Sequence, residues 1–286
     1  MLGRRTTGSV VCPSCGSLVG VRDDRCYTCG RANPGLWGFG PALRNLGADL
    51  GFVPLVVGGS SIVYIITLLA SGGDFQVMGG LFSILAPSPQ VLFIFGASGA
   101  LPVFGAGRWW TLLSATWLHG GLLHILFNML MLRQLGYATV DLIGPARTII
   151  VYTVAGVCGF LLSSLGGLLF GGLPIPVLRG ASFTVGASAS IFGLLGAMVH
   201  YGRKGSSMVQ GYAMSYAISM FVFGLAMPGI DNYAHAGGFL GGYLASAVMN
   251  PLTKERGDHL IIAIGCLAAS LLSIVWSVVS ALRLIR

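Results

Sequence analysis

Two short stretches of the chain, FGASGA at 95–100 and VGASAS at 185–190, each place a serine among small residues in apolar surroundings. Nucleophilic serines often stand in such stretches, so Ser98 and Ser188 are both candidates. A serine hydroxyl needs a neighbouring base to become a nucleophile. The chain has five histidines, and most of them lie in or near other apolar stretches.

The stretch TWLHGGLLHILFNML carries His119, His124 and Asn128, spaced five and four residues apart. At 3.6 residues per turn, His124 and Asn128 stack on one helix face with His119 about one turn above, so three polar side chains point the same way. One alternative is a set of polar contacts between helices. Another is a metal site, which is disfavoured because asparagine is a poor ligand for metals that prefer imidazole.

Ser188 opens an apolar stretch at about 186–202, directly after the polar loop RGASFT. The first turn of a helix has free backbone amides and the positive end of the helix dipole, which suit an oxyanion. For a serine considered alone, packing or N-capping is the commoner role. Ser98 instead lies in an irregular stretch with no helix start after it, so we expect a turn that closely approaches other backbone.

His235 lies about one turn inside the apolar stretch that begins near Asp231. Gly238 and Gly242 follow it at a spacing that lets another helix approach closely. A histidine found alone in such a place is more often structural. Its relation to Ser188 therefore depends on how the helices are arranged.

The composition indicates a membrane protein, since 55% of the 286 residues are hydrophobic, only 8% are charged and the mean hydropathy is +0.84. Long stretches without Lys, Arg, Asp or Glu separate the charged residues. Each of these stretches is long enough for a helix of roughly 20 residues, the length that crosses a bilayer. Prolines and glycines break the interval 75–107, which we interpret as an interfacial or partly embedded loop. The predicted spans are 50–73, 109–132, 148–178, 180–202, 205–230, 232–253 and 259–282.

The net charge of +8 is explained by where Lys and Arg lie relative to these spans. If the N-terminus is cytoplasmic, most Lys and Arg residues fall on the inner side, as the positive-inside rule requires. The charge therefore gives no reason to expect a nucleic-acid partner, and no signal peptide is visible in the first 45 residues. The second, fourth and sixth spans then run inward and place His124, Ser188 and His235 at one depth in the outer half of the membrane. Acyl transfer requires such a set of nucleophile, base and hydrogen-bond donors.

Two CxxC pairs lie near the N-terminus, formed by Cys12, Cys15, Cys26 and Cys29, each pair followed by glycine. Four thiolates at this spacing can surround a tetrahedral zinc ion with no open coordination position, so the predicted site is structural. The alternatives are disulfides or free thiols, and a cytoplasmic location disfavours disulfides. Some 20 residues cannot build a core, so the metal would itself hold the fold.

The motifs GRWWTLL, LHGGLLHILFNM, GASASIFGLLGA and AHAGGFLGG occur in this order and together resemble the rhomboid family of intramembrane serine proteases. The resemblance covers roughly 52–250 and implies a six-helix core with a Ser-His dyad and no aspartate. It places the nucleophile on Ser188, the general base on His235, and the oxyanion site on the Ser188 amide with His124 and Asn128. It gives His119 a supporting role and packs Phe192 against the His235 ring.

Three positions depart from the family pattern. Ala189 stands where a glycine usually follows the nucleophile, which adds a methyl group beside the oxyanion site and could slow catalysis. Thr111 follows Trp110 where an arginine is typical, and Val140 stands in place of a glutamate. These last two positions would affect loop anchoring, and none of the three removes the dyad.

The expected fold is an all-α polytopic membrane protein, a rhomboid-like six-helix bundle with an extra C-terminal transmembrane helix and a small zinc-ribbon-like module. The expected domains are the module and linker at 1–45, the protease core at 46–252 and the extra helix at 253–286. We expect an endopeptidase without a catalytic cofactor that acts on transmembrane proteins in the lipid bilayer, and the plasma membrane of a prokaryote as its location. The alternatives are an inactive rhomboid-like protein that binds membrane proteins, and a transporter, which predicts buried mid-span charges and repeat symmetry that are not clear here.

Overall fold

A computed structural model of the protein describes residues 6–12, 14–38, 50–72, 84–174, 178–227, 229–253, 255 and 257–285. The chain divides into two compact units, Met1–Gly51 and Phe52–Arg286. The second unit contains both the motif-bearing helices and the C-terminal helix. The expected boundary at residue 253, within this unit, stays a prediction.

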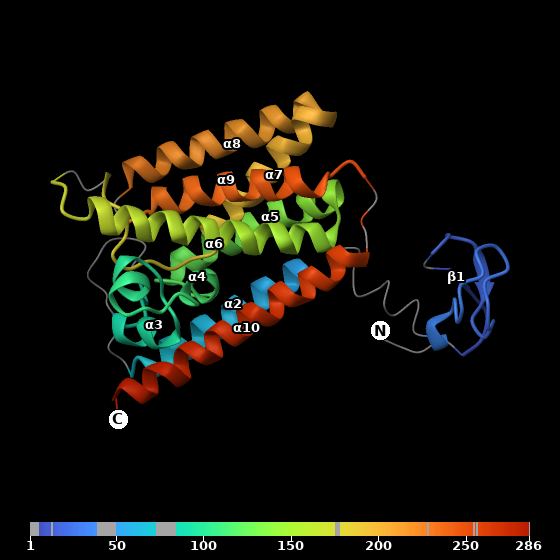
Figure 1. Ribbon diagram of the computed structural model, residues 1–286, viewed down its shortest axis with the longest axis horizontal. Coiled ribbons are helices and arrows are strands. Elements are labelled where there is room, and N and C mark those ends of the chain that lie inside the picture. Colours follow the sequence, from blue (N-terminus) through green and yellow to red (C-terminus); the bar gives the residue numbers. More distant parts are fainter. Residues whose placement is uncertain are drawn as a thin grey trace. The chain divides into compact units, whose positions relative to one another are not determined.

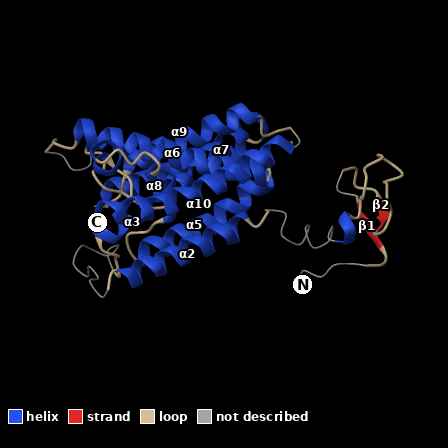
Figure 2. Ribbon diagram, turned by 60° about the horizontal axis from the view of Figure 1, so that its bottom comes forward, coloured by secondary structure: helices blue, strands red, loops and turns tan. Residues whose placement is uncertain are grey.

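The N-terminal unit is built on a short antiparallel hairpin, in which β1 (Ser9–Val11) pairs with β2 (Leu18–Gly20) (Figure 2). Its small core consists of the buried residues Val10, Cys12, Val19, Val21 and Cys26. The five-residue core is far too small to order a chain by burial alone. This agrees with the expectation that a metal supplies part of the fold.

The second unit is almost entirely helical (Figure 1). Long helices lie side by side, with shorter turns between the first and the second of them. In chain order the elements are α2 (Phe52–Ala70), α3 (Pro89–Phe95), η3 (Leu101–Gly105), α4 (Thr111–Ser114), η4 (Ala115–Trp117), α5 (Leu122–Ile143), α6 (Pro145–Phe170), α7 (Ser188–Gly205), α8 (Ser207–Ala226), α9 (Asn232–Met249) and α10 (Gly257–Ile285).

Each of the seven predicted spans overlaps a long helix, although α5 continues to Ile143, well past the predicted end at 132. Not every helix is a span by length and composition. Four of them meet that test, namely α2, α6, α8 and α10, and a fifth is reached if α4, η4 and α5 count as one bent span. Polar residues and glycines lower the hydropathy of α7 and α9, which pack against each other within the bundle. The chain is an integral multi-pass membrane protein.

The second predicted span, 109–132, is not one continuous helix. Between Trp117 and Leu122 the helix direction changes by 92°, where Gly120 and Gly121 interrupt the apolar sequence. His119 lies in this break and not on the helix that carries His124. The expectation of one helix face for all three polar residues was therefore wrong for His119.

The interval predicted as an embedded loop is described from residue 84 onward and contains only short elements. Ser98 pairs with Thr184 through two backbone hydrogen bonds of 3.0 and 2.8 Å. Gly99 has a φ of 122°, and a Cβ atom there would lie 2.6 Å from the carbonyl oxygen of Ser182. The expected close backbone approach is confirmed, although a short helical turn, η3, does follow Ser98, contrary to expectation.

Glycines set the spacing between α6, α7 and α9. A Cβ atom at Gly159 would lie 2.6 Å from the carbonyl oxygen of Ala234, and one at Gly238 or Gly242 would collide with the backbone of α7. Real side chains do not tolerate such distances, so α6 and α7 approach α9 backbone to backbone. The close approach predicted from Gly238 and Gly242 is confirmed.

Candidate active site

Ser188 and His235 meet across the contact between α7 and α9. Ser188 is the first residue of α7, and His235 lies one turn into α9. The distance from His235 Nε2 to Ser188 Oγ is 3.0 Å, which is a hydrogen bond suited to proton transfer from the hydroxyl to the imidazole. The two residues are 47 positions apart in the sequence, so only the tertiary structure brings them together.

The His235 ring is held by stacking. The Phe192 ring lies 4.2 Å from it, centroid to centroid, at an angle of 13°, as the resemblance led us to expect. Among the described residues, His235 Nδ1 has no hydrogen-bond partner. In a Ser-His-Asp triad a carboxylate at the ring edge orients the imidazole, whereas here an aromatic ring packs on the face of the imidazole.

His124 and Asn128 lie on α5 beside the backbone that precedes Ser188. The amide of Gly120 donates to His124 Nδ1 at 3.3 Å, so in the neutral imidazole Nε2 carries the proton and is a donor. Asn128 donates one amide hydrogen to the carbonyl of His124 at 3.0 Å, and its second hydrogen is free to serve another acceptor. Both side chains therefore have a donor group beside Gly186, two residues before Ser188.

Gly186 is a residue that the sequence argument passed over. Its φ is 133°, and a Cβ atom there would lie 2.7 Å from His124 Nε2. Its amide donates to the carbonyl of Ala115 at 3.0 Å. A glycine is therefore required both for the backbone conformation and for the space that His124 occupies.

His119 lies next to the oxyanion candidates without joining them. Its ring contacts the His124 ring edge to face at 5.3 Å, and it is fully buried. In the part of the chain that the structure describes, neither of its ring nitrogens has a hydrogen-bond partner. This position suits a supporting role behind His124.

Ala189, the residue after the nucleophile candidate, packs against a glycine of α6. It lies against α6, where a Cβ atom at Gly159 would come within 2.7 Å of it, and Ala189 is fully buried. The methyl group fills the space that Gly159 leaves open. The expected effect of this methyl group on the oxyanion site stays a prediction.

Asp231 connects α6 and α9 beside the dyad, and sequence reasoning used it only as the charge that begins a span. Its carboxylate caps α9 by accepting from the Ala234 amide at 3.0 Å. It also accepts from the hydroxyl of Ser163 on α6 at 2.5 Å. The residue thus fixes the first turn of the helix that carries His235.

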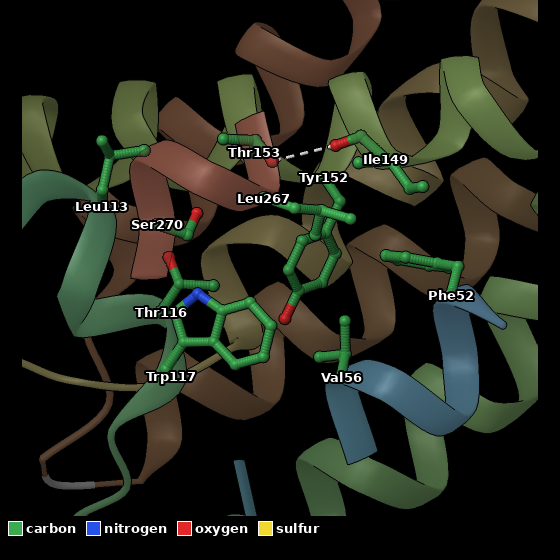
Figure 3. Close-up of a pocket in the computed structure, with 10 residues that line it drawn as sticks. All are labelled: Phe52, Val56, Leu113, Thr116, Trp117, Ile149, Tyr152, Thr153, Leu267 and Ser270. Carbon is green, nitrogen blue, oxygen red and sulfur yellow. Dashed lines mark hydrogen bonds between the residues drawn. The ribbon is translucent and has the colours of Figure 1, made fainter. Parts of the chain in front are cut away.

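A small cavity lies apart from the dyad, between α2, η4, α6 and α10 (Figure 3). The Tyr152 side chain reaches into it and is buried, and its hydroxyl has no hydrogen-bond partner within the described residues. Thr116 and Ser270 also line the cavity. None of the residues proposed for catalysis contributes to it.

The four N-terminal cysteines converge in their own unit. Their sulfur atoms lie within 4.8 Å of one another, with Cys12 and Cys29 at 3.8 Å and Cys15 and Cys26 at 3.6 Å. Tetrahedral zinc with bonds of about 2.3 Å requires sulfurs about 3.8 Å apart, whereas a disulfide requires about 2.05 Å. The cluster therefore fits a metal ion.

The local backbone of the cluster explains its shape. Gly16 and Gly30 follow the two CxxC pairs with φ of 80° and 71°, and their amides donate to the carbonyls of Cys12 and Cys26. Hydrogen bonds from the hydroxyl and amide of Ser17 lower the pKa of the Cys15 thiol to about 6. The thiolate form that binds metal is thus favoured at Cys15 at neutral pH, whereas the pKa of the Cys29 thiol in the same cluster is raised to about 12.

Comparison with known proteins agrees with the helical geometry. The model of the rhomboid domain family matches residues 106–252, which include the dyad and the oxyanion candidates. The chain belongs to the rhomboid family. RHOMBOID-like protein 4 of Arabidopsis thaliana is 32% identical over 220 residues, covering 69% of this chain and 52% of that protein.

Two further rhomboid relatives show the range of the family. Rhomboid protease GluP of Bacillus subtilis is 31% identical over 180 residues, covering 61% of this chain and 33% of that protein. RHOMBOID-like protein 5 of Arabidopsis thaliana is 30% identical over 217 residues, covering 69% and 67%. The chain spans about half or less of the length of the first relatives it matches.

Proposed function

We propose that this rhomboid protein is an intramembrane serine endopeptidase that cuts other membrane proteins within or at the outer border of a transmembrane segment. The observation that carries the proposal is the 3.0 Å hydrogen bond between Ser188 Oγ and His235 Nε2 at the start of a helix. A peptide bond within a helix is shielded from attack, so the substrates are transmembrane helices that unwind easily.

The first half of the reaction forms an acyl-enzyme. Ser188 Oγ attacks the peptide carbonyl carbon while its proton passes to His235 Nε2. The oxyanion of the tetrahedral intermediate accepts hydrogen bonds from the Ser188 amide, His124 Nε2 and the Asn128 amide group. His235 then gives its proton to the leaving nitrogen, and the carbon–nitrogen bond breaks.

The second half of the reaction releases the acyl group. His235 takes a proton from water, and the resulting hydroxide attacks the ester carbonyl. The ester bond then breaks, and Ser188 Oγ recovers a proton from His235. No metal or organic cofactor takes part in this scheme, which uses only groups of the chain itself.

The proposed orientation places the N-terminus in the cytoplasm. The excess of Lys and Arg on the inner segments supports it through the positive-inside rule. The start of α7 and the start of α9 then lie near the outer surface, where water for deacylation is at hand. We propose the plasma membrane of a prokaryote as the location, with 1–45, 46–252 and 253–286 as module, protease core and additional helix.

A serine-reactive fluorophosphonate tests the proposal directly. The purified protein in detergent should be labelled at Ser188, and labelling should be lost in Ser188→Ala and strongly reduced in His235→Ala. Ser98→Ala is the matched control, because Ser98 stands in the similar GAS stretch, and it should be labelled like the wild type. No labelling of the correctly folded wild type would contradict the proposal.

A rhomboid-like protein that binds membrane proteins without cutting them is the second candidate. The residues that favour it are Ala189 after the serine and Thr111 in place of the usual arginine. Labelling of the wild type would exclude it. If labelling fails, capture of intact transmembrane proteins by the folded chain would support it.

We also propose that Cys12, Cys15, Cys26 and Cys29 bind one structural zinc ion. Metal analysis of the purified protein should find about one zinc per chain, and Cys12→Ser or Cys26→Ser should lose it. Cys158→Ser is the matched control, because this cysteine lies on α6 outside the cluster. A metal-free protein with oxidised N-terminal cysteines would overturn the assignment.

A further inference from the structure

We infer that α10, the helix beyond the matched family domain, positions the segment that supports Ser188 by holding Arg108 and Trp110. The effect on Ser188 rests on the proposed protease function. The docking of Arg108 on α10 does not, and it can be measured separately.

Arg108 is the largest fully buried side chain among the described residues, with 2% of its surface exposed. Its guanidinium donates to the carbonyls of Phe93 at 2.5 Å and Ser277 at 3.0 Å. It also lies 4.2 Å from the centroid of the Phe93 ring. Burial of a charged group is costly unless its donors are paired, and Nε has no partner among the described residues. The Ser277 carbonyl of α10 is one of three backbone carbonyls that offset this cost.

Trp110 binds the same residue of α10. Its indole N–H donates to the Ser277 hydroxyl at 3.0 Å, and its ring packs edge to face on Trp276 at 6.1 Å. One position of α10 thus accepts hydrogen bonds from two residues of the loop before α4. These contacts join parts of the chain that are 167 and 169 residues apart.

The contact with α10 is tight at Gly96, the C-cap of α3. A side chain at Gly96 would collide with the hydroxyls of Ser114 and Ser277, and the Ser114 hydroxyl donates to the Gly96 carbonyl at 2.8 Å. The end of α3, the end of α4 and the middle of α10 therefore meet at one point. A larger side chain at Ser277 has no room there.

The same segment supports the backbone before Ser188 from two sides. Ala115, directly after Ser114, accepts the amide of Gly186, and Ser98 pairs with Thr184. Displacement of the segment would move the loop that ends at Ser188. We therefore class Arg108 and Ser277 as positioning residues, since neither touches the dyad.

This arrangement accounts for the absence of an arginine directly after Trp110, where the family pattern has one. Thr111 occupies that position and donates its hydroxyl to the Arg108 carbonyl at 2.7 Å. The guanidinium enters from two residues before Trp110 instead, and it reaches a helix that the matched domain lacks. The anchoring function is retained by a different residue and a different partner.

Trypsin provides a readout that does not depend on activity. Arg108 is the sole Lys or Arg between Arg44 and Arg133, so a cut after it gives fragments that mass spectrometry identifies. The wild type should resist cleavage at Arg108. Ser273→Ala should resist it too, because among the described residues the Ser273 hydroxyl donates to the Ser270 carbonyl of the same helix. Ser277→Leu should be cut there, and a resistant Ser277→Leu protein would overturn the docking inference.

The rate of fluorophosphonate labelling tests the link to Ser188. Ser277→Ala removes one hydrogen bond and should slow maximal labelling about five-fold, with little change in the apparent affinity for the probe. Trp110→Phe should have a similar effect, and the double variant should be no slower than either single variant. Cleavage at Arg108 in Ser277→Leu with unchanged labelling would overturn the link. If the wild type is not labelled, the proposed function fails, while the trypsin result still decides the docking.

Discussion

The ring of Phe192 lies nearly parallel to the ring of His235, one helical turn after the serine that His235 contacts. Stacking of this kind contributes about 0.5–1.5 kcal/mol beyond surface burial. Replacement of Phe192 by leucine should free the imidazole to rotate and slow fluorophosphonate labelling about 3- to 10-fold. Phe223→Leu, at an exposed position of α8, is the control. Equal labelling of both variants would show that stacking does not orient His235.

Gly186→Ala should remove most of the activity. The new methyl group would meet His124 Nε2, and the backbone conformation at φ 133° is one that alanine rarely adopts. Loss of an oxyanion donor costs about 100-fold or more in rate, and labelling kinetics will measure it. Gly211→Ala is the control, since nothing lies within 4 Å of a Cβ atom there. Activity of Gly186→Ala near that of the control would exclude His124 from the oxyanion site.

Ala189→Gly should leave the labelling rate within about two-fold of the wild type, because the lost methyl group packs against Gly159 of α6. The variant should instead unfold at a lower temperature, since glycine within a helix costs about 1 kcal/mol relative to alanine. Labelling kinetics and thermal unfolding in detergent separate the two effects. A marked gain in rate would mean that the methyl group does obstruct the oxyanion.

Asp231→Ala should both destabilise the protein and slow labelling. It removes the cap of α9 and leaves the Ser163 hydroxyl without its acceptor, at a cost of about 1–3 kcal/mol. Asp231→Asn keeps a capping oxygen and should retain more of both properties. If the two variants unfold at the same temperature, the carboxylate does not cap α9.

The sequence was sufficient to predict the helices and the meeting of Ser188 with His235. Uncharged intervals located the long helices, although α5 and α7 continue past charged residues such as Arg133 and Arg203. The topology placed both residues at one membrane depth. The 92° bend before α5 was missed, although Gly120 and Gly121 were visible signals, because an apolar interval shows length and not continuity. Contacts such as Arg108 with Ser277 could not be predicted, since they depend on which distant helices become neighbours.

The direction of the Ala189 methyl group was also beyond the sequence. The family pattern shows which residue follows the nucleophile. Which neighbouring helix the side chain of that residue contacts depends on the packing of α6 and α9. Asp231 was missed for a related reason. Its partners Ser163 and Ala234 lie on different helices, and a single aspartate at a span boundary has no periodicity to reveal them.

The glycines that line the contact of α9 with α6 and α7 limit which substitutions the active-site geometry tolerates. Gly159, Gly238 and Gly242 bring the backbones together because they carry no side chains. The 3.0 Å distance between Ser188 and His235 thus depends on the absence of side chains at these glycines. A methyl group added at any of these glycines should push the helices apart and lengthen that distance without contacting either catalytic residue. Loss-of-function substitutions away from the active site should therefore concentrate at these glycines.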